Sequence, residues 1–378
     1  MLAAGVGTSP RALLEAAPPI VSATVHDLLL RKSDPTWRFA LAANPDNRGL
    51  ILELRAADGR VGLGSAGEVR HLGHDLATMR AVVGAVAAHI AAPADAGEAL
   101  DELDRIGGPA RAIVQMALLD LVARSRDLPA HELLGTLRRD RVALTRILSL
   151  KAPDRMAAVA AQHVAEGYRH LKIKLDNADG DADYARVAAI RSAVGPDVAL
   201  TVDANQSYRP DDALRLCDRL APLDLLLFEQ PVPADDIDGL AFLTARSPVP
   251  IEADEAADSL DRLREIVARR AAHGVSVKLP KLGGIDRART AIDYCRAGGV
   301  PVRIGAHVGS RLLNAAALHL AAVVDELAEP AELAEFARLE GDPAQGLDIV
   351  DGTLVLPGGP GLGVHLSEPD HRAEGSSL

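Results

Sequence analysis

The run Val198-Ala-Leu-Thr-Val-Asp203 shows the pattern on which the chain is built, because an apolar, strand-like segment ends in a charged residue. Two further runs end in a carboxylate, namely Leu225-Leu-Leu-Phe-Glu229 and Val249-Pro-Ile-Glu-Ala-Asp254, and two end in a lysine, namely Leu171-Lys-Ile-Lys174 and Val275-Ser-Val-Lys278. A helix-like segment separates each run from the next. Charged groups that repeatedly end buried strands in this way are typical of the active face of a (β/α) barrel.

Strands and helices alternate strictly after Arg141. The sequence predicts strands at 142–148, 170–174, 198–203, 225–229, 250–253, 275–278 and 302–305. It predicts helices at 153–166, 181–194, 210–220, 236–244, 258–271, 284–297 and 311–324. These seven strand–helix units indicate a parallel sheet, and an eighth strand, which we place at Leu333–Phe336, would close it into a barrel.

The chain before residue 141 has a different pattern. Residues 20–67 are strand-like, with Asp58-Gly59 as a hairpin turn, and helices are predicted at 76–103, interrupted at Pro93, and at 109–126. For 378 residues, one large barrel with a smaller domain is expected. We therefore predict an α/β protein: an α+β capping domain (20–140), a modified (β/α) TIM-like barrel (141–346), and a tail (347–378) that returns to the cap. Met1–Pro19 is predicted to be a loose extension.

Composition and charge argue against several classes of partner. The formal net charge of −12 disfavours nucleic acid and anionic membranes. No apolar run approaches the ~20 residues needed to span a bilayer, and the N-terminus lacks the charged start and apolar core of a signal peptide. The two cysteines, Cys217 and Cys295, provide no disulfide framework. We expect a cytoplasmic homo-oligomer that acts on a small molecule.

Three carboxylates at a regular period predict a metal site. Asp203, Glu229 and Asp254 are 26 and then 25 residues apart, which is one strand–helix unit each. Strand ends converge at the mouth of a barrel, where three unneutralised acids would repel one another. A hard divalent cation removes this repulsion, and all-oxygen ligation favours Mg²⁺. The alternative is that each acid caps the helix that follows it, but the shared period favours the metal site.

Lysines lie on both sides of these acids. Lys174 and Lys278 end the second and sixth predicted strands, which would place one amine on each face of a metal-bound substrate. Lys172 shares a strand face with Lys174, because side chains two residues apart point the same way. Neighbouring ammonium groups and a metal would lower an amine's pKa and so provide a base near neutral pH. The alternative, that these lysines reach solvent, is less consistent with the Lys-x-Lys spacing.

Several motifs, taken in order, resemble the enolase superfamily, and specifically its muconate-lactonizing-enzyme-like subgroup. They are Lys172-Ile-Lys174, Asp203-Ala-Asn205, Glu229-Gln-Pro231, Ala253-Asp-Glu255, Lys278-Leu-Pro-Lys-Leu-Gly-Gly284 and, in the tail, Gly359-Pro-Gly-Leu-Gly363. The resemblance covers nearly the whole chain. It implies a capped, modified barrel, with Mg²⁺ (Mn²⁺ as an alternative) held by Asp203, Glu229 and Asp254. It also implies that Lys174 and Lys278 are the acid/base pair, and we assign Lys172, Asn205 and Glu255 supporting roles.

The chain departs from the family pattern near its last two predicted strands. Lys278 differs from the mandelate-racemase-like branch, which has an aspartate there, yet His307 lies near where that branch keeps its histidine. We therefore place His307 among the candidate substrate contacts. The glutamate that the favoured subgroup often carries near Gly309 is absent. So is the Asp-x-Asp signature of a dipeptide epimerase, where Ala334-Glu-Phe336 stands instead.

The predicted activity is Mg²⁺-dependent removal of a proton next to a carboxylate, through an enolate that the metal stabilises. With one lysine on each face, a racemase or epimerase is expected, or a cycloisomerase. A dehydratase acting on a hydroxy acid would use the same enolate. A Schiff-base lyase that uses Lys278 is a different class and leaves the three acids without a role. A member that has kept the fold and lost turnover is the third alternative.

Overall fold

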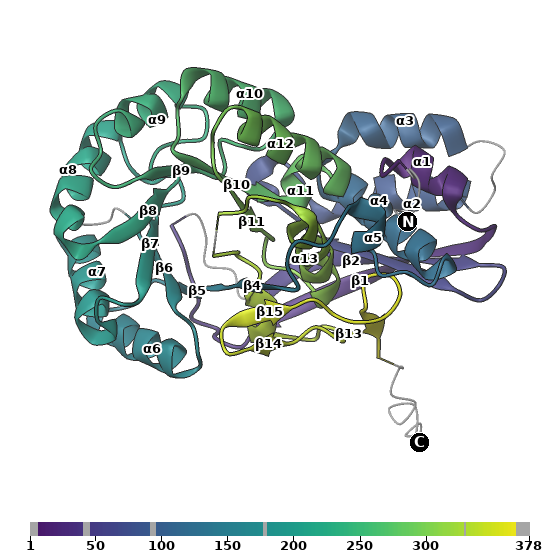
Figure 1. The fold of residues 1–378 in the computed structure, drawn as a ribbon, viewed down its shortest axis with the longest axis horizontal. Coiled ribbons are helices and arrows are strands. Elements are labelled where there is room, and N and C mark those ends of the chain that lie inside the picture. The colour runs from purple at the N-terminus through teal and green to yellow at the C-terminus, as the bar shows by residue number, and fades with distance from the viewer. Residues whose placement is uncertain (1–6, 41–45, 91–95, 177–179, 329, 368–378) are drawn as a thin grey trace.

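The computed structural model describes residues 7–40, 46–90, 96–176, 180–328 and 330–367. Figure 1 shows a curled parallel sheet whose helices cover its outer side, next to a body made of the early strands and helices. This is the capped, TIM-like barrel that the sequence predicts, and the fold prediction is confirmed. The interruption predicted at Pro93 lies outside the described residues.

The barrel wall is a seven-stranded parallel sheet in which sequential strands are neighbours. Its strands are β5 (Thr145–Leu148), β6 (His170–Lys174), β7 (Ala199–Asp203), β8 (Leu225–Glu229), β9 (Ile251–Ala253), β10 (Gly274–Lys278) and β11 (Val302–Gly305). The helices that alternate with them are α6 (Pro153–Ala165), α7 (Gly180–Val194), α8 (Pro210–Leu220), α9 (Ile237–Thr244), α10 (Leu260–Arg269), α12 (Ile285–Ala297) and α13 (Arg311–Val323). A short helix, α11 (Leu279–Leu282), follows β10. Bounds and order agree closely with the predicted alternation.

The eighth position of the barrel differs from the prediction. Leu333–Phe336 is not a strand: a 3₁₀ helix, η4 (Glu335–Arg338), begins there instead. The closing segment is Ala331-Glu332, which bridges Leu144 on one side and Gly305 on the other in parallel fashion. Its backbone bonds include Glu332 N to the carbonyl of Ile304 (2.9 Å) and Thr145 N to the carbonyl of Ala331 (2.9 Å). The barrel therefore closes through two residues, too few to show the period of a strand in the sequence.

The register of the wall sets the height of the charged residues. Lys174 pairs with Asp203, and Asp203 pairs with Glu229, so three of the predicted site residues lie at one level. On the next strand, the residue that pairs with Glu229 is Glu252, and Asp254 lies two residues beyond it. Both point into the barrel, because side chains two residues apart share a strand face.

The cap is an antiparallel sheet covered by helices. Its strands are β1 (Ile20–Lys32), β2 (Asp46–Ala56), β3 (Val61–Gly67) and, from late in the chain, β12 (Leu339–Glu340), which pairs with β1. Its helices are α2 (Leu76–Ile90), α3 (Ala96–Ile106), α4 (Gly108–Ser125) and α5 (His131–Leu134). The loose extension predicted at the N-terminus is wrong for its second half, because α1 (Pro10–Ala16) buries Leu13 completely.

Helix α4 is buried on nearly every side and joins the cap to the barrel. Strand β3 approaches it so closely that a Cβ at Gly64 would meet the carbonyl oxygen of Ile113 at 2.1 Å, which only glycine avoids. On the barrel side, Arg111 donates two hydrogen bonds to Asp286 of α12, at 2.7 and 2.8 Å. Because the pair is bidentate and Arg111 is buried, it fixes the orientation of α4 against the barrel.

The C-terminal tail packs against both bodies. Strands β14 (Ile349–Val350) and β15 (Thr353–Val355) extend the short β4 (Arg141–Ala143), and β13 (Ala344–Gln345) pairs with β16 (His365–Leu366). In the cap, the buried carboxylate of Asp120 accepts backbone N–H bonds from Leu63 (2.9 Å) and from Leu362 in the tail (2.7 Å). The cap sheet also includes β12, which lies within the range predicted for the barrel. The boundaries at 140 and 346 remain a prediction.

Two further predictions concern the chain as a whole. Within the described ranges, no helix has the length and apolar content needed to cross a bilayer. Cys217 and Cys295 are both buried free thiols, on α8 and α12. Burial raises the pKa of each thiol to about 11, so neither is poised to react as a thiolate.

Candidate active site

A cavity of about 490 Å³ lies where the cap meets the open end of the barrel. The cap contributes Trp37, Phe39 and His71 to its wall. Seven of the nine predicted site residues also line it: Lys172, Lys174, Asn205, Asp254, Glu255, Lys278 and His307. The other two, Asp203 and Glu229, are fully buried at the strand ends next to these residues.

Lys174, at the end of β6, lies on one side of the acids. Its Nζ donates to the carboxylate of Asp203 and, at 2.8 Å, to Oδ1 of Asn205. Asn205 in turn donates from Nδ2 to Oε1 of Glu255 at 3.0 Å. Asn205 adopts a positive φ of 41°, and its backbone N–H donates to Asp203 at 2.9 Å. The turn after β7 therefore links three predicted site residues with Glu255 of the β9 loop.

Lys172 lies deeper than Lys174, on the same strand face, as predicted. Its Nζ lies 2.8 Å from Glu229 Oε2 and 3.3 Å from Asp203 Oδ2. It also contacts Oε1 of Glu332 at 2.6 Å. Burial would lower the pKa of Lys172, but Glu229, Glu332 and Asp203 outweigh it and raise the pKa well above its usual range. Lys172 is therefore an ammonium that connects the acids rather than a neutral base.

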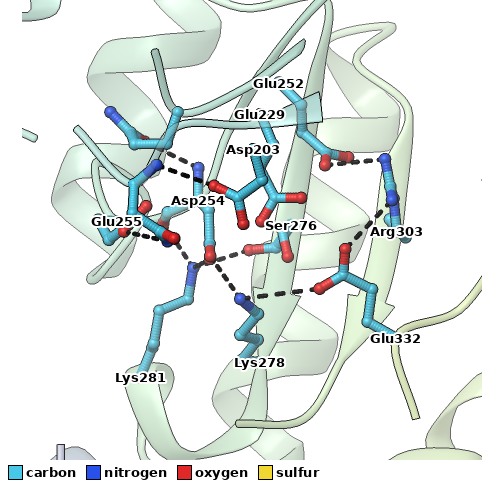
Figure 2. Close-up of polar contacts among 12 residues, drawn as sticks. Asp203, Glu229, Glu252, Asp254, Glu255, Ser276, Lys278, Lys281, Arg303 and Glu332 are labelled. Atoms are coloured by element: carbon cyan, nitrogen blue, oxygen red, sulfur yellow. Dashed lines mark hydrogen bonds and ion pairs between the residues drawn. The ribbon is translucent and has the colours of Figure 1, made fainter. Parts of the chain in front are cut away.

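Asp254 lies on the opposite side, just beyond β9. The side-chain oxygen of Gln230 holds this loop by accepting backbone N–H bonds from Asp254 (2.9 Å) and Ala256 (3.0 Å). The carboxylate of Asp254 accepts a hydrogen bond from Lys278 Nζ and another from Lys281 Nζ, the latter at 2.6 Å. Figure 2 shows Lys278 between Asp254 and Glu332. Lys278 Nζ is 3.9 Å from Glu332 Oε2.

A buried ion cluster below this level was not predicted. Arg303 of β11 is almost completely buried and contacts Glu252 at 2.9 Å and Glu332 at 3.2 Å. Figure 2 shows its guanidinium between the two carboxylates. The spacing Glu252-x-Asp254 was a usable signal for Glu252, because both side chains must share a strand face. Glu332 gave no such signal, since its two-residue segment has no strand pattern.

Two more residues of the site were missed. Lys281 appears in the sequence motif but was given no role, and the structure buries its ammonium against Asp254 and the carbonyl of Ser276 (2.9 Å). His71 comes from the 3₁₀ turn η1 (Arg70–Leu72) of the cap, and its ring centroid lies 6.0 Å from that of His307. Nothing local in the sequence could connect the two histidines, because they are more than 230 residues apart.

The acids of the site have very different pKa values. Burial and the nearby Glu332 raise the pKa of Glu229 well above its usual range, despite Lys172. Burial also acts on Asp254, but Lys278 and Lys281 hold its pKa well below that range. Burial, Asp254 and Asp203 raise the pKa of Glu255 to about 7.

The lowered amine pKa expected from the sequence is not found at Lys278. Burial lowers its pKa, but Asp254, Glu332 and Glu229 outweigh burial and raise it. The expectation counted the neighbouring ammonium groups and the metal but not Glu332. When only the groups of the protein act on Lys278, the carboxylates determine the direction of its pKa shift, which is upward.

A divalent cation fits the chemistry of this cluster. Asp203, Glu229 and Asp254 are hard oxygen donors at adjacent strand ends, and burial and the neighbouring acids, Glu332 above all, raise the pKa of Glu229, an effect that a bound cation would oppose. As the side chains stand, no three His, Cys, Asp or Glu residues of the described ranges surround a common point at ligand distance. Lys172 Nζ instead bridges Asp203 and Glu229. Glu252 of β9 lies two residues before Asp254 and pairs with Arg303.

The comparison with known families agrees with this geometry. Residues 155–370, which contain every strand-end acid and lysine described above, match the model of the "Enolase C-terminal domain-like" family. This chain belongs to the enolase superfamily. Within it, the relatives are racemases, epimerases and cycloisomerases, and the protein is an isomerase of that kind.

Three curated relatives show the range of the similarity. The L-Ala-D/L-Glu epimerase of Bacillus subtilis is 35% identical over 68% of this chain and 70% of its own length. The hydrophobic dipeptide epimerase of Enterococcus faecalis is 31% identical over 89% of this chain and 96% of its own. Muconate cycloisomerase 1 of Rhodococcus opacus is 30% identical over 92% of this chain and 95% of its own length.

Solved structures give the same result. The substrate-liganded L-Ala-D/L-Glu epimerase of Bacillus subtilis superposes with a TM-score of 0.85 at 29% identity, covering 91% of this chain and 98% of that one. The dipeptide epimerase of Enterococcus faecalis, complexed with Mg and the dipeptide L-Leu-L-Tyr, has a TM-score of 0.85 at 30% identity, covering 92% and 99%.

Proposed function

We propose that the protein is a Mg²⁺-dependent racemase or epimerase of an amino-acid-derived carboxylate, with Lys174 and Lys278 as its two acid/base residues. The observation that carries the proposal is their placement. The two ammonium groups come from β6 and β10, line one cavity, and contact different acids, Asp203 and Asp254. A substrate held between them would present one face of its α-carbon to each lysine.

Asp203, Glu229 and Asp254 are the residues that would hold the metal, which would bind the substrate carboxylate and stabilise the negative charge of the enolate. Mn²⁺ is an alternative ion, since it accepts the same oxygen ligands. The complexes of related epimerases with Mg and a dipeptide support this assignment.

The remaining residues orient the two bases. Lys172 and Lys281 contact the acids from below; Lys281 helps to hold the pKa of Asp254 low and so favours its ionised, ligating form, and Lys172 opposes the raised pKa of Glu229. Asn205 fixes Lys174 on one side, and Glu332 lies beside Lys278 on the other. A base on one face removes the α-proton as the ammonium on the other face returns one, which inverts the centre.

Cycloisomerisation is the second candidate, supported by the similarity to muconate cycloisomerase. It uses the same enolate but needs only one proton transfer. Elimination from a hydroxy acid would also need only one face. The presence of a lysine on each side of the cavity favours racemisation or epimerisation over both. The Schiff-base alternative lacks a role for the buried acids and is not proposed further.

Solvent deuterium exchange tests the proposal. The protein with Mg²⁺ is incubated in D₂O with dipeptides, N-acyl-amino acids and hydroxy acids, and mass spectrometry follows label at the α-carbon. We expect exchange of both enantiomers of at least one amino-acid-derived carboxylate. Exchange of a single enantiomer with a new ring or a lost hydroxyl would show a cycloisomerase or a dehydratase instead. No exchange with any of these carboxylates would contradict the proposal.

Three expectations from the sequence remain predictions: the domain boundaries at residues 140 and 346, the homo-oligomeric state and the cytoplasmic location. Light scattering coupled to size-exclusion chromatography measures the oligomeric state directly.

A further inference from the structure

A short loop of the cap, Ser33–Phe39, follows β1 and brings aromatic side chains to the active-site cavity. Trp37 and Phe39 both line that cavity, and their rings lie 5.5 Å apart. Lys32 Nζ lies 3.8 Å from the centre of the Trp37 ring, and Lys174 Nζ lies 5.4 Å from that of Phe39. The position of this cap loop therefore sets how two aromatic rings meet a ligand in the cavity.

The first half of the cap loop is a polar turn. The carboxylate of Asp34 accepts a hydrogen bond from the backbone N–H of Thr36 at 3.0 Å and another from its hydroxyl at 2.6 Å. The N–H of Trp37 donates to the carbonyl of Asp34 at 3.1 Å. An aspartate that bonds the backbone two residues on is a common turn device. The carboxylate of Asp34 and the hydroxyl of Thr36 thus form one polar group directly before Trp37.

Lys151, in the barrel loop between β5 and α6, contacts both members of this turn. Its Nζ lies 2.8 Å from Oδ2 of Asp34 and donates to Oγ1 of Thr36 at 2.6 Å. The backbone of Lys151 is itself anchored, because its carbonyl accepts from Arg186 Nε at 3.3 Å. Arg186 is buried and pairs with the buried Asp183. The ammonium of Lys151 therefore reaches the cap from a fixed point of the barrel.

The two residues before Lys151 hold the cap loop on the other side of Trp37. The N–H of Arg38 donates to Ser149 Oγ at 3.2 Å, and the N–H of Leu150 donates to the carbonyl of Arg38 at 3.2 Å. The loop is thus attached to the barrel both before and after Trp37. An isolated surface ion pair contributes little, but here the ion pair is one of several contacts from three consecutive barrel residues.

We propose that Lys151 is a positioning residue, which holds Trp37 and Phe39 at the cavity without touching the substrate itself. Lys151 lies outside the lining of the 490 Å³ cavity and borders a smaller cavity of about 130 Å³ that Trp37 also lines. The inference rests on the proposed function, because it names a residue that acts on ligand binding in the same site. The side chains of Lys151 and Asp34 are 26% and 39% exposed, so water and salt compete for their contact.

Trp37 is the single tryptophan of the chain, so its fluorescence reports on the cap loop directly. Lys151→Met keeps the length of the side chain, removes its charge and its donors, and leaves the Asp34 turn intact. In the free protein, quenching of Trp37 by acrylamide should increase and its emission should shift to longer wavelength, because the half-buried ring moves toward water. Lys151→Arg keeps the charge and donors and should retain the wild-type values.

Kinetics with Mg²⁺ separates positioning from chemistry. KM and kcat are measured for the carboxylate whose α-proton exchanges fastest in D₂O. Lys151→Met should raise KM about three- to tenfold, the usual effect of a lost hydrogen bond, and should change kcat by less than about twofold. The split is expected because Lys151 acts on the substrate only through the rings of the cap loop. Lys151→Arg should restore the wild-type KM.

Arg219→Met is the matched control. Arg219 of α8 pairs with Asp181 of α7 at the same distance of 2.8 Å, and neither of these described residues lines the cavity. This variant should change neither fluorescence nor KM. Salt provides a second control, since the Debye length falls to about 3 Å in about 1 M KCl. Salt should raise the quenching of wild type toward that of Lys151→Met and leave the variant unchanged.

Thermal melting first establishes that each variant is folded. Wild-type quenching and emission in folded Lys151→Met would overturn the inference, and so would increased quenching with an unchanged KM. An equal rise of KM in Arg219→Met would overturn it as well. The fluorescence does not depend on activity. Increased quenching without α-proton exchange of any carboxylate would support the role of Lys151 and remove the racemase proposal, whereas exchange with unchanged fluorescence would do the reverse.

Discussion

The two sides of the cavity are built differently around equivalent lysines. On the Lys174 side, the partners Asp203 and Asn205 follow on the adjacent strand, and the ring of Phe39 lies 5.4 Å from the ammonium. On the Lys278 side, Glu332 comes from the closing segment and the two imidazoles come from β11 and the cap. The difference shows that the barrel places the two lysines symmetrically, whereas the surroundings of Lys278 are assembled from distant parts of the chain.

The largest expected effect concerns the three candidate metal ligands, which both sides of the cavity share. Asp203→Asn, Glu229→Gln and Asp254→Asn should each lower turnover at least about a thousandfold, because several kcal/mol of enolate stabilisation is lost. Exchange of both enantiomers should fall together. Calorimetric titration with Mg²⁺ measures the expected loss of affinity. An acid whose replacement left Mg²⁺ affinity unchanged would not be a ligand.

Replacing one lysine should separate the two sides. Lys278→Ala should lower inversion by about 10²- to 10⁴-fold, the usual range for a general acid–base group, yet leave α-proton exchange of the enantiomer that faces Lys174. Lys174→Ala should give the mirror result. Mass spectrometry of each enantiomer in D₂O measures both rates. A single variant that still exchanged both enantiomers at similar rates would show that the lysines do not face opposite sides.

The ion cluster beneath the Lys278 side should matter for stability. Arg303→Met leaves the buried carboxylates of Glu252 and Glu332 without their common partner, which costs about 3 to 5 kcal/mol for a broken buried pair. Urea unfolding measures this loss. Arg303→Met combined with Glu252→Gln should recover part of it. If the single variant were as stable as wild type, the cluster would contribute nothing net to folding.

A smaller effect is expected from the aromatic wall of the Lys174 side. Trp37 and Phe39 lie 5.5 Å apart and line the cavity between Lys32 and Lys174. Phe39→Ala should raise KM about tenfold, because one aromatic contact to the substrate is lost. Steady-state kinetics on the preferred substrate gives KM and kcat separately. An unchanged KM would mean that the ring of Phe39 does not reach the substrate.

A further effect, on the pH dependence of stability, concerns the scaffold rather than the site. His131 and His319 stack at 5.7 Å, and burial lowers the pKa of His319 to about 4. Since the unfolded residue titrates near 6.5, unfolding takes up a proton between these values. His319 therefore stabilises the fold fully above pH 6.5, and this contribution declines as the pH falls toward 4, by on the order of 3 kcal/mol for about 2.5 pKa units.

The control for this pH effect is His319→Gln, compared with wild type by thermal melting from pH 7 to 4. The free energy of unfolding should depend less steeply on pH in the variant, because about one proton fewer is taken up on unfolding. An identical slope in both proteins would assign the acid sensitivity to other groups, such as His307 in the site, whose pKa is also lowered by burial and Lys278.

The sequence predicted the fold and the Lys174 side because both depend on local periodicity. Residues such as Lys174, Asp203 and Glu229 each end a strand whose pattern is strong, so their common level follows from register alone. The Lys278 side was only partly predictable. Arg303 interrupts the apolar pattern of β11. Its guanidinium can be buried there because it pairs with Glu252 of β9 and Glu332 of the closing segment. Glu332 and His71 reach the cavity through tertiary contacts that no local pattern records.

The two-residue closing segment also gives the barrel a mechanical asymmetry. Strands β6, β7 and β8 are joined by ladders of several residue pairs, with one irregularity between Leu200 and Thr201, whereas Ala331-Glu332 is held by single bridges on each side. Strand β9 pairs with each of its neighbours at two positions, so the closing segment, with one bridge on each side, is the weakest joint of the ring. Any widening of the barrel would therefore move Glu332 relative to Lys172 and Lys278 while Asp203 and Glu229 keep their spacing. The longer ladders carry Asp203 and Glu229, and the weakest joint carries Glu332, which lies beside Lys278.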